Sequence, residues 1–411
     1  MRYGLLGRSL PHSHSPWIHQ AFGNGDYGLF EIPPEELPAF MARRDFQGLN
    51  VTLPYKQAVL PYLDALSDTA RHCGGVNTIL RREDGTLYGD NTDAAGLEGL
   101  LEEVGVSLRD QKVLILGTGG TANCARYVVS QKGGIPVLIS RRGENDYAHL
   151  QCHRDAALLI NATPVGMMPD VELSPVDLAR LPGLLGVVDV IYNPRRTRLL
   201  QQAMELGIPC IGGLRMLVWQ AAASHQLFTG EALSSEIVDR VVRELNRRTL
   251  SVALIGMPGS GKTTLGGLLA RDMGRPFRDT DRLMEAESGC TIPEIFARDG
   301  EAAFRQLERD MLQRETLSGG QVLAAGGGAV LRQDNRRAIR QNAVVVWLQR
   351  SPELLATEGR PLSVSLSALQ RMEEERTPLY QACADLILPN NGTIAEGLAA
   401  LKEALHEYLG D

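Results

Sequence analysis

The 411-residue sequence contains no pair of cysteines with C-x-x-C spacing. Its six cysteines stand singly, at positions 73, 124, 152, 210, 290 and 383, which argues against a zinc ribbon. Sparse, unpaired cysteines are typical of a reducing compartment. No apolar run approaches the roughly 18 residues that span a bilayer, and the first 13 residues contain no segment long enough for a signal peptide. We therefore expect a cytoplasmic protein that does not bind membranes.

Blocks of basic residues are also absent. The chain has 42 Lys and Arg against 49 Asp and Glu, so its net charge is −7 and nucleic acid is not an expected partner. Only five of the basic residues are lysines, so a lysine inside a motif is of particular interest. Apolar residues make up 44% of the chain and charged residues 22%, which excludes wholesale disorder. At about 150 residues per domain, the length predicts two or three domains.

Three short apolar runs are each followed by a glycine-rich turn. They begin at residues 112, 250 and 321, and their glycine turns begin at Gly117, Gly256 and Gly326. A strand, a tight glycine turn and a helix open a βα unit of a parallel sheet, so we expect an α/β protein. Residues 1–100 lack such a turn and read as a separate α/β substrate lobe. Apolar residues at helical spacing predict a helix over 231–248, and we place a domain boundary at residue 247.

Residues 256–263, Gly-Met-Pro-Gly-Ser-Gly-Lys-Thr, match the phosphate-binding pattern G-x-x-x-x-G-K-[ST] in full. In such a loop, backbone N–H groups surround phosphates, Lys262 supplies a positive charge, and Thr263 offers a hydroxyl to Mg²⁺. Asp279 and Asp281 follow; on a strand their alternation would put both carboxylates on one face. One carboxylate can then serve the metal and the other can accept a proton from a substrate hydroxyl. The alternative is a solvated acidic turn.

Further motifs follow in the order Phe304-Arg305-Gln-Leu-Glu308, Gly326-Gly-Gly328, Arg360-Pro-Leu and Arg376-Thr-Pro-Leu-Tyr380. With them, about residues 250–410 resemble shikimate kinase. The resemblance implies a P-loop domain at 248–411, like that of the nucleoside-monophosphate kinases, which uses MgATP to phosphorylate the 3-hydroxyl of shikimate. It implies catalysis by Lys262 and Asp281 and Mg²⁺ binding by Thr263 and Asp279. It implies substrate binding by Asp281, Arg305, Gly327 and Arg376, and ATP binding by Gly259, Ser260, Gly261, Lys262, Thr263, Thr264 and Arg360.

Residues 117–122, Gly-Thr-Gly-Gly-Thr-Ala, fit the dinucleotide-binding pattern G-x-G-x-x-[GA] between a strand and a helix. Where such a turn binds NAD, an acidic residue about 20 positions on meets the ribose. Here the next strand ends in Ser140-Arg141-Arg142 instead. Two cations can bind a 2′-phosphate, so we expect NADP; the alternative is a pair of solvated arginines.

Four clusters of polar residues lie upstream of this turn. They are Ser13-His-Ser15-Pro, Asn50-Val-Thr52-Leu-Pro-Tyr-Lys56, Gly75-Val-Asn77-Thr78 and Gly89-Asp-Asn91-Thr-Asp93. A polyhydroxylated acid needs many such hydrogen-bonding groups. Reduction of a ketone also needs a proton donor, a role that suits Lys56 with Asp93 to orient it and keep it protonated. The alternative for Lys56 is a solvated lysine.

With Ile160-Asn-Ala-Thr163, Tyr192-Asn-Pro and Gly213-Leu-Arg-Met-Leu-Val-Trp-Gln220, these clusters resemble shikimate dehydrogenase over about residues 1–245. The resemblance implies a substrate lobe at 1–100, completed by helices at about 214–247, and a Rossmann-like NADP domain at 101–247. Lys56 and Asp93 would be catalytic. Shikimate would be bound by Ser13, Ser15, Thr52, Asn77, Asp93, Tyr192 and Gln220. NADP would be bound by Gly117, Thr118, Gly119, Gly120, Thr121, Ser140, Arg141, Arg142, Val190 and Gly213.

The two resemblances together predict a bifunctional enzyme of aromatic amino-acid biosynthesis. One half would reduce 3-dehydroshikimate with NADPH, and the other would phosphorylate the product with MgATP. One alternative is that the kinase-like half is a non-catalytic sensor that regulates the dehydrogenase. Another is a dehydrogenase that prefers quinate, although Ser13 and Ser15 favour shikimate. Because all motifs of one kind precede residue 247 and all of the other kind follow it, we expect the halves to be separable there.

Overall fold

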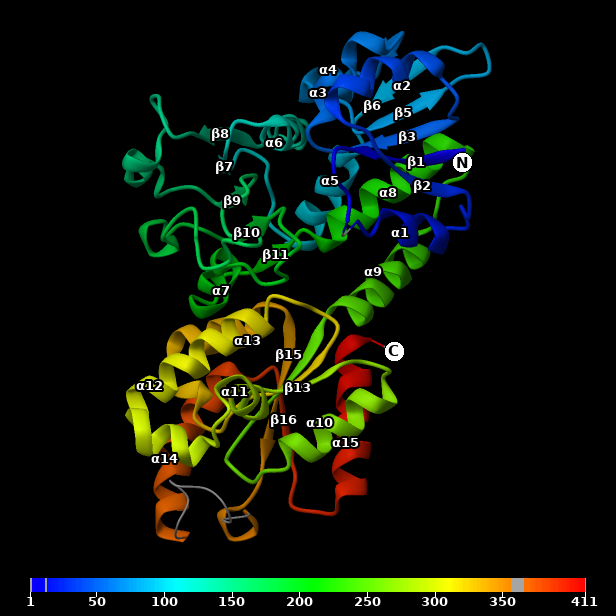
Figure 1. Ribbon diagram of the computed structural model, residues 1–411. Helices are drawn as coiled ribbons and strands as arrows, with labels where there is room; N and C mark the ends of the chain where they lie inside the picture. Colours follow the sequence, from blue (N-terminus) through cyan, green and yellow to red (C-terminus); the bar gives the residue numbers. More distant parts are fainter. Residues whose placement is uncertain (1, 12, 356–365, 411) are drawn as a thin grey trace. The chain divides into compact units, whose positions relative to one another are not determined.

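The computed structural model describes residues 2–11, 13–355 and 366–410. The chain forms two compact units, Met1–Val242 and Arg243–Asp411 (Figure 1), and the division falls within helix α9 (Ser235–Thr249). This helix begins four residues later than the sequence pattern predicts, because Gly230 ends the preceding helix in a left-handed conformation. Both units contain sheets covered by helices, which confirms the α/β class. Within the described residues, none of the helices combines the length and the apolar character that a membrane crossing requires.

The first lobe of the amino-terminal unit contains a mixed sheet. The strand order is β2 (Tyr27–Glu31), β1 (Tyr3–Gly7), β3 (Gly48–Val51), β5 (Thr78–Arg81), β6 (Leu87–Asp90) and β4 (Ala65–Leu66). Strand β5 runs antiparallel to β3 and β6, whereas β1 pairs in parallel with both of its neighbours. The helices of this lobe are α1 (Ser15–Ala21), α2 (Leu37–Arg43), α3 (Tyr55–Ala58) and α4 (Asp68–Cys73).

The second lobe contains a parallel sheet. Its order is β11 (Cys210–Gly212), β10 (Gly186–Asp189), β9 (Leu158–Asn161), β7 (Lys112–Leu116) and β8 (Ile135–Ile139). Strands β7 and β9 are almost continuously apolar, and all their residues except Lys112 are buried, as expected for a sheet that is covered on both faces. The chain passes from β7 to β8 on one side and then to β9 on the other, so loops diverge at the carboxyl ends of β7 and β9. Such a switch point is where α/β sheets bind ligands.

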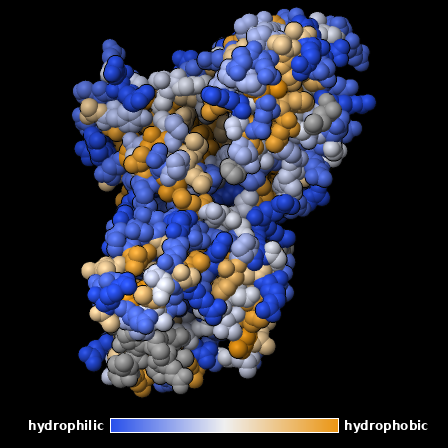
Figure 2. All heavy atoms as spheres, in the orientation of Figure 1, coloured by the Kyte–Doolittle hydropathy of each residue, from blue (hydrophilic) through white to orange (hydrophobic). Residues whose placement is uncertain are grey.

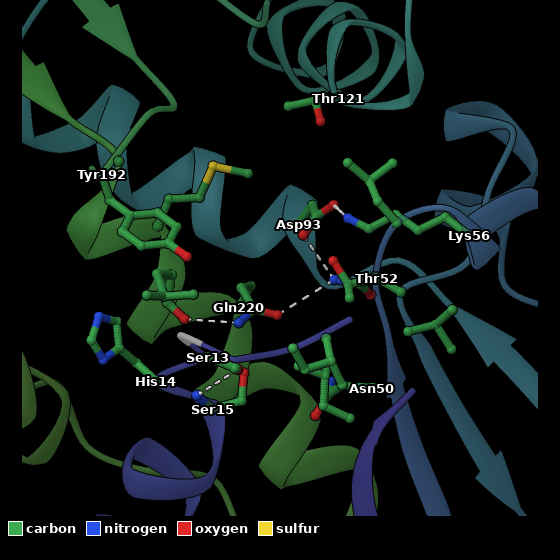
Figure 3. Close-up of a pocket in the computed structure, with 18 of the residues that line it drawn as sticks. Ser13, His14, Ser15, Asn50, Thr52, Lys56, Asp93, Thr121, Tyr192 and Gln220 are labelled. Carbon is green, nitrogen blue, oxygen red and sulfur yellow. Dashed lines mark hydrogen bonds and ion pairs between the residues drawn. The ribbon is translucent and has the colours of Figure 1, made fainter. Parts of the chain in front are cut away.

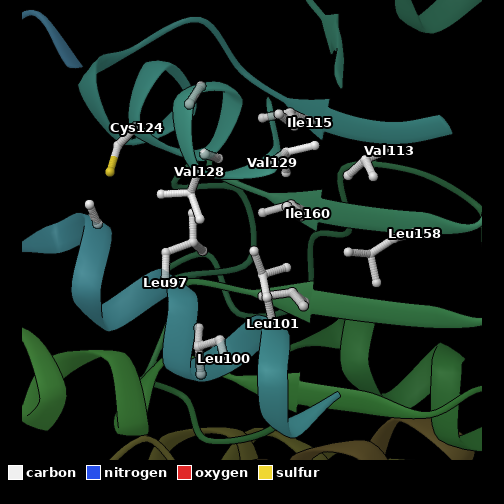
Figure 4. Packing of buried hydrophobic residues seen from close by; sticks show 14 of the residues in the cluster. Leu97, Leu100, Leu101, Val113, Ile115, Cys124, Val128, Val129, Leu158 and Ile160 are labelled. Atoms are coloured by element: carbon white, nitrogen blue, oxygen red, sulfur yellow. The ribbon is translucent and has the colours of Figure 1, made fainter. Parts of the chain in front are cut away.

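Helix α5 (Asp93–Glu103) joins the two lobes. Its residues Leu97, Leu100 and Leu101 pack against helix α6 (Gly120–Gln131) and the second sheet (Figure 4). Helix α8 (Leu214–Thr229) returns along α5 so closely that a Cβ on Gly96 would lie 2.7 Å from the Met216 carbonyl oxygen. Helix α7 (Arg198–Glu205) covers the second sheet near β10 and β11. Packing along α5 thus fixes the groups at its amino end, including Asp93.

The carboxy-terminal unit contains a second parallel sheet. Its order is β13 (Phe277–Asp279), β14 (Val322–Ala324), β12 (Ser251–Ile255), β15 (Ala343–Gln349) and β16 (Leu386–Pro389). Its helices are α10 (Lys262–Asp272), α11 (Thr280–Ser288), α12 (Ile292–Glu315), α13 (Gln333–Gln341), α14 (Leu366–Cys383) and α15 (Ile394–Leu409). Separate apolar clusters fill the two faces of the sheet. The central strand β12 leads directly into the glycine loop 256–261, and α10 begins at the end of that loop.

Candidate active sites

A cavity of about 470 Å³ lies between the two lobes of the amino-terminal unit. Figure 2 shows that the face of this unit is hollowed, and Figure 3 shows polar side chains from both lobes that point into the cavity. All seven residues that the resemblance implies for shikimate binding line it: Ser13, Ser15, Thr52, Asn77, Asp93, Tyr192 and Gln220. Lys56 also lines it, as do Thr121, Val190 and Gly213 from the set implied for NADP. The structure thus brings together residues that are up to 207 positions apart in the sequence.

Lys56 and Asp93 form an ion pair inside this cavity, with 2.5 Å between Nζ and Oδ2. Lys56 is the second residue of α3, and Asp93 is the first residue of α5. The other carboxylate oxygen of Asp93 accepts a hydrogen bond of 2.8 Å from Asn77 Nδ2. The Asp93 side chain is only 11% exposed and that of Lys56 27%, so Lys56 is held at the cavity and does not extend freely into solvent. Both oxygens of Asp93 have a partner, which fixes the ammonium group in place.

A buried chain of hydrogen bonds supports Asn77 from behind. Tyr27 Oη donates to Asn50 Oδ1 at 2.7 Å, and Asn50 Nδ2 donates to Thr78 Oγ1 at 3.2 Å. Thr78 Oγ1 in turn donates to Asn77 Oδ1 at 3.0 Å. Asn77 Oδ1 also accepts from the backbone N–H of Thr92 at 2.7 Å. These contacts fix the orientation of the Asn77 amide, whose Nδ2 must then face Asp93.

Tyr27, Asn50, Thr78 and Thr92 were not among the predicted site residues. Asn50 and Thr78 lie inside motifs that were read as polar clusters, so a signal was present for them. Nothing in the sequence around Tyr27 distinguishes it from a core aromatic residue. The His19 ring stacks on Tyr27 at a centroid distance of 4.0 Å, and burial lowers the pKa of His19 to about 3, so this histidine is neutral at physiological pH.

The opposite wall of the cavity comes from α1, α8 and the loop after β10. Ser13 Oγ accepts from the backbone N–H of Ser15 at 3.2 Å, at the start of α1. Gln220 on α8 donates through Nε2 to the Leu217 carbonyl at 2.8 Å, so its amide oxygen faces the cavity side where Asn77 lies, 3.5 Å away. Burial raises the pKa of Tyr192, which keeps its hydroxyl protonated and able to donate.

The glycine turn after β7 has the geometry of a phosphate-binding turn. Gly117 has a φ of 109°, and Gly119 is the N-cap of α6. A Cβ built on Gly119 or Gly120 meets no atom of the described chain within 4 Å, so open space lies beside the amino end of this helix. Helix amino ends bind anions through free N–H groups and the helix dipole. Past β8, Arg141 and Arg142 are exposed, and these cations fit the phosphates of a dinucleotide.

The carboxy-terminal unit has its own cavity, of about 450 Å³. Nearly all residues that the kinase resemblance implies line it: Gly259, Gly261, Lys262, Thr263, Thr264, Asp279, Asp281, Arg305, Gly327 and Arg376. Ser260 is fully buried beneath the glycine loop and does not line the cavity. Arg360 lies outside the described residues. The two halves of the chain thus each provide a polar cavity at the carboxyl edge of a sheet.

The loop from Gly256 to Gly261 wraps around the Lys262 ammonium. Gly256 and Gly261 have φ of 145° and 99°, and a Cβ on Gly256 would lie 2.5 Å from the Leu348 carbonyl oxygen, so only glycine fits there. Lys262 Nζ donates to the carbonyl oxygens of Gly256 and Met257, both at 2.9 Å. Asn390, the residue after β16, was not among the predicted site residues; its Nδ2 donates to the Ser260 carbonyl at 2.8 Å and ties the loop to the end of that strand.

Asp279 and Asp281 do not alternate along a strand, so that part of the sequence reasoning is wrong. Asp279 ends β13 and caps α11, accepting from the N–H groups of Asp281 and Arg282 through Oδ1, and Asp281 belongs to the helix. The first helical turn, not the pleat of a strand, brings both carboxylates to the cavity. Thr263 Oγ1 donates to Asp279 Oδ2 at 2.7 Å. Burial, reinforced by the Asp279 carboxylate, raises the pKa of Asp281, while Lys262 and Arg305 oppose the rise.

Two guanidinium groups face the same cavity. Arg305 Nη1 forms an ion pair of 2.8 Å with Glu308, whose side chain is 1% exposed. Arg376 Nη1 donates to the Gly327 carbonyl at 3.2 Å, and Tyr380 Oη donates to the same oxygen at 2.5 Å. Paired arginine groups at one cavity are suited to a carboxylate. The contacts of Glu308 and Tyr380 were not foreseen, although both residues lie within the quoted motifs.

Glycines 326–328 are required by this packing. A Cβ on Gly326 would lie 2.7 Å from Glu308 Oε1 and 2.8 Å from Asp281 Oδ1. A Cβ on Gly328 would collide with the Arg305 guanidinium. The backbone of this turn therefore forms one wall of the cavity and leaves room for a ligand between the carboxylates and the arginines.

The fold and the two cavities define a Rossmann-type oxidoreductase joined to a P-loop phosphotransferase. Family models match residues 5–79 as a shikimate dehydrogenase substrate binding domain and residues 258–406 as shikimate kinase. Shikimate dehydrogenase (NADP(+)) of Moorella thermoacetica is 37% identical over 276 residues, which cover 58% of this chain and 92% of the relative. That of Pyrococcus furiosus is 38% identical over 258 residues, which cover 58% and 94%.

Solved structures are similar over the same part of the chain. Shikimate 5-dehydrogenase of Thermus thermophilus in complex with NADP(H) and shikimate has a TM-score of 0.54 at 34% identity, covering 59% of this chain and 99% of that one. A chorismate mutase/shikimate 5-dehydrogenase fusion from Clostridium acetobutylicum has a TM-score of 0.56 at 34% identity, covering 59% and 96%. The chain belongs to the shikimate dehydrogenase family and carries a shikimate kinase domain in its carboxy-terminal unit. Both resemblances drawn from the sequence are confirmed.

Proposed function

We propose that the chain is a bifunctional enzyme of the shikimate pathway. Its amino-terminal unit reduces 3-dehydroshikimate with NADPH, and its carboxy-terminal unit phosphorylates shikimate at the 3-hydroxyl with MgATP. The observation that carries the proposal is the pair of cavities, one around the Lys56–Asp93 ion pair and one that joins the glycine loop to Asp281. The two reactions are consecutive, so each activity makes the other useful to the same cell.

In the dehydrogenase reaction, NADPH supplies a hydride to the ketone carbon. Lys56 donates a proton from Nζ to the carbonyl oxygen as negative charge develops there, a step that general-acid residues accelerate. Asp93 holds the ammonium group in position, and Asn77 orients Asp93. The hydroxyls of Ser13, Ser15 and Tyr192 and the amide of Gln220 bind the hydroxyl and carboxylate groups of the substrate.

The residues around the second sheet suit NADP. Gly117, Thr118, Gly119 and Gly120, at the amino end of α6, would hold the pyrophosphate of the cofactor. Thr121, Val190 and Gly213, which line the cavity, would contact its nicotinamide end. Ser140, Arg141 and Arg142 bind the 2′-phosphate. The relatives named above carry NADP(+) in their names, which supports this choice.

In the kinase reaction, ATP supplies the phosphoryl group and Mg²⁺ neutralises its phosphates. Lys262 and the N–H groups of residues 259–264 bind the phosphates. Thr263 and Asp279 provide the hydroxyl and carboxylate oxygens that Mg²⁺ prefers. Asp281 orients the attacking hydroxyl and accepts its proton, while Arg305, Arg376 and Gly327 hold the substrate. Arg360, which lies outside the described residues, would bind the phosphates of ATP.

One tube that contains 3-dehydroshikimate, NADPH and MgATP tests both activities. We expect NADPH oxidation and formation of shikimate 3-phosphate. Lys56→Ala should stop the first reaction and leave phosphorylation of added shikimate intact, and Lys262→Ala should do the reverse. Accumulation of shikimate without phosphorylation in the wild-type protein would favour a non-catalytic kinase-like sensor.

Quinate is the second candidate substrate for the dehydrogenase. A solved quinate dehydrogenase of Corynebacterium glutamicum, in complex with NAD, is 29% identical with a TM-score of 0.53. The Ser13 and Ser15 hydroxyls at the cavity favour shikimate. Oxidation of quinate with NAD at a higher kcat/KM than oxidation of shikimate with NADP would reverse this choice.

A further inference from the structure

Asp189 is a fully buried carboxylic acid at the carboxyl edge of the second sheet. It is the last residue of β10, and it lies in register between Asn161 on β9 and Gly212 on β11. It does not line the cavity, so it does not touch the substrate. Burial of a carboxyl group is costly unless hydrogen bonds compensate it, and burial raises the pKa of Asp189 to about 6.

Three donors converge on this carboxyl group. Oδ1 accepts from Asn161 Nδ2 at 3.0 Å and from the Ile191 backbone N–H at 3.1 Å. Oδ2 accepts from Thr197 Oγ1 at 2.6 Å. A carboxylate accepts on both oxygens at once, whereas an amide accepts on one side only, and its NH2 group could pair here only if the Thr197 hydroxyl rotated to accept. The carboxyl group therefore matches its surroundings as they stand.

Each donor belongs to a different segment. Ile191 lies in the loop after β10, between Val190 and Tyr192, which both line the cavity. Asn161 holds the loop after β9, because its Oδ1 accepts from the backbone N–H of Thr163 at 3.1 Å. Thr197 caps α7, and its hydroxyl accepts from the Leu200 N–H. One carboxyl group thus fixes the loops after β9 and β10 and the helix that follows.

The loop after β10 also fixes the backbone at Gly213, which faces it. The Gly213 N–H donates to the Ile191 carbonyl at 2.9 Å. A Cβ on Gly213 would collide with the Val190 carbonyl, so the two segments are in direct backbone contact. A shift of Ile191 would therefore move Val190, Tyr192 and Gly213 together. These are the groups on the nicotinamide and substrate side of the cavity, far along the sheet from Arg141.

We propose that Asp189 is a positioning residue for the dehydrogenase, which holds Val190 and Tyr192 in place by fixing the Ile191 backbone and the Asn161 side chain. This inference rests on the proposed reduction of 3-dehydroshikimate with NADPH. Because Asp189 acts at the nicotinamide side, its loss should impair turnover more than binding of the adenosine end of the cofactor. Thr197 shares the role, since its hydroxyl donates to the second oxygen.

The test uses the full chain: its kinase activity reports the amount of chain, and binding of adenosine 2′,5′-bisphosphate reports whether the amino-terminal unit is folded. Asp189→Asn should lower kcat/KM for reduction at least about tenfold, or ~1.4 kcal/mol. The ligand adenosine 2′,5′-bisphosphate lacks the nicotinamide half of NADP. Its dissociation constant should stay within a factor of about 3 of the wild-type value, a change small enough to come from a minor rearrangement of the site. Thr197→Val should also lower kcat/KM for reduction. Thr197→Ser, which keeps the hydroxyl, should give a near-normal rate of reduction.

Asp155→Asn is the matched control. It removes a carboxylate beside the other end of the same sheet, where Asp155 pairs with Lys112, and should leave reduction unchanged. The positioning role would be wrong if the Asp189→Asn variant reduced 3-dehydroshikimate at the normal rate. It would also be wrong if the substitution weakened binding of adenosine 2′,5′-bisphosphate as much as it lowered turnover. A wild-type chain without reductase activity would overturn the proposed function, and this inference with it, before any variant is compared.

Discussion

The side chains of Lys56 and Asp93 meet at 2.5 Å although the residues are 37 positions apart in the sequence. A second Lys–Asp pair in the same unit offers a direct comparison. Lys112 and Asp155 approach to 2.6 Å, and the two lysine side chains are equally exposed, at 27%. The carboxylates differ: Asp93 is 11% exposed at the cavity, and Asp155 is 67% exposed at the surface. Burial beside a cavity, and not the pair itself, therefore distinguishes the candidate acid.

The first prediction follows from this comparison. Lys56→Ala should lower the rate of 3-dehydroshikimate reduction by about 10²-fold or more, the scale expected for loss of a positioned general acid. Lys112→Ala, which breaks the exposed pair, should change the rate little. Steady-state NADPH oxidation measures both variants, shikimate phosphorylation reports the amount of chain, and binding of adenosine 2′,5′-bisphosphate reports the folded amino-terminal unit. Near-normal reduction by Lys56→Ala would remove the lysine from the mechanism.

The second prediction concerns the choice of cofactor. Arg141 and Arg142 are exposed at the end of β8, where an NAD enzyme usually carries an acid. We expect NADP to exceed NAD in kcat/KM at least about tenfold, or ~1.4 kcal/mol. Arg141→Ala should narrow this ratio through a higher KM for NADPH, whereas Arg154→Ala, at another exposed position of the unit, should not. Equal use of both cofactors by the unmodified protein would count against the assignment.

The third prediction concerns Asp281 and pH. Asp281→Asn should abolish phosphoryl transfer while ATP still binds the loop at 256–263, because the substitution removes the proton acceptor and leaves the loop intact. Asp272→Asn, in an exposed pair with Lys402, is the control. Isothermal titration with ATP and a coupled assay of phosphorylation separate binding from turnover. An active Asp281→Asn variant would show that another group accepts the proton.

The raised pKa of Asp281 sets the direction of the pH dependence. A proton acceptor must be ionised, so kcat/KM of the kinase for shikimate, which reports the protein before shikimate binds, should fall as the pH is lowered through this pKa. Because burial and the Asp279 carboxylate raise the pKa, the fall should begin at a higher pH than for an ordinary aspartate. A profile of kcat/KM against pH measures it. A kcat/KM that stays constant down to the usual titration range of aspartate would contradict the proposed base.

Particular residues show what could be predicted from the sequence. The glycine loop at 256–263 was predictable because local spacing specifies a strand, a turn and a helix. The Lys56 cluster was predictable because polar residues in short motifs indicate a binding site. Asp279 and Asp281 were expected together, but for the wrong reason, since the end of β13 was not visible in the sequence. Tyr27 and Asp189 support the sites through tertiary hydrogen bonds alone. Sequence spacing carries no information on such contacts.

The final prediction concerns separation of the two units. Fragments 1–247 and 248–411 should each keep its own activity, since each cavity is lined by residues of a single unit. The end of α9 is also tied to the carboxy-terminal unit. Arg275 donates to the carbonyl oxygens of Arg247 and Leu250, and burial lowers the pKa of this arginine, which makes loss of a partner costly.

A kinase fragment that begins at residue 243 should therefore be more stable than one that begins at residue 248. The difference should be about 1–3 kcal/mol, the cost of leaving a partly buried charged donor without its acceptor. Urea unfolding of the two fragments measures it, and Arg275→Ala should bring their midpoints together. Equal stability of the two unmodified fragments would mean that the Arg247 carbonyl is dispensable. Fragments that regain activity only when mixed would show instead that the sites depend on both units.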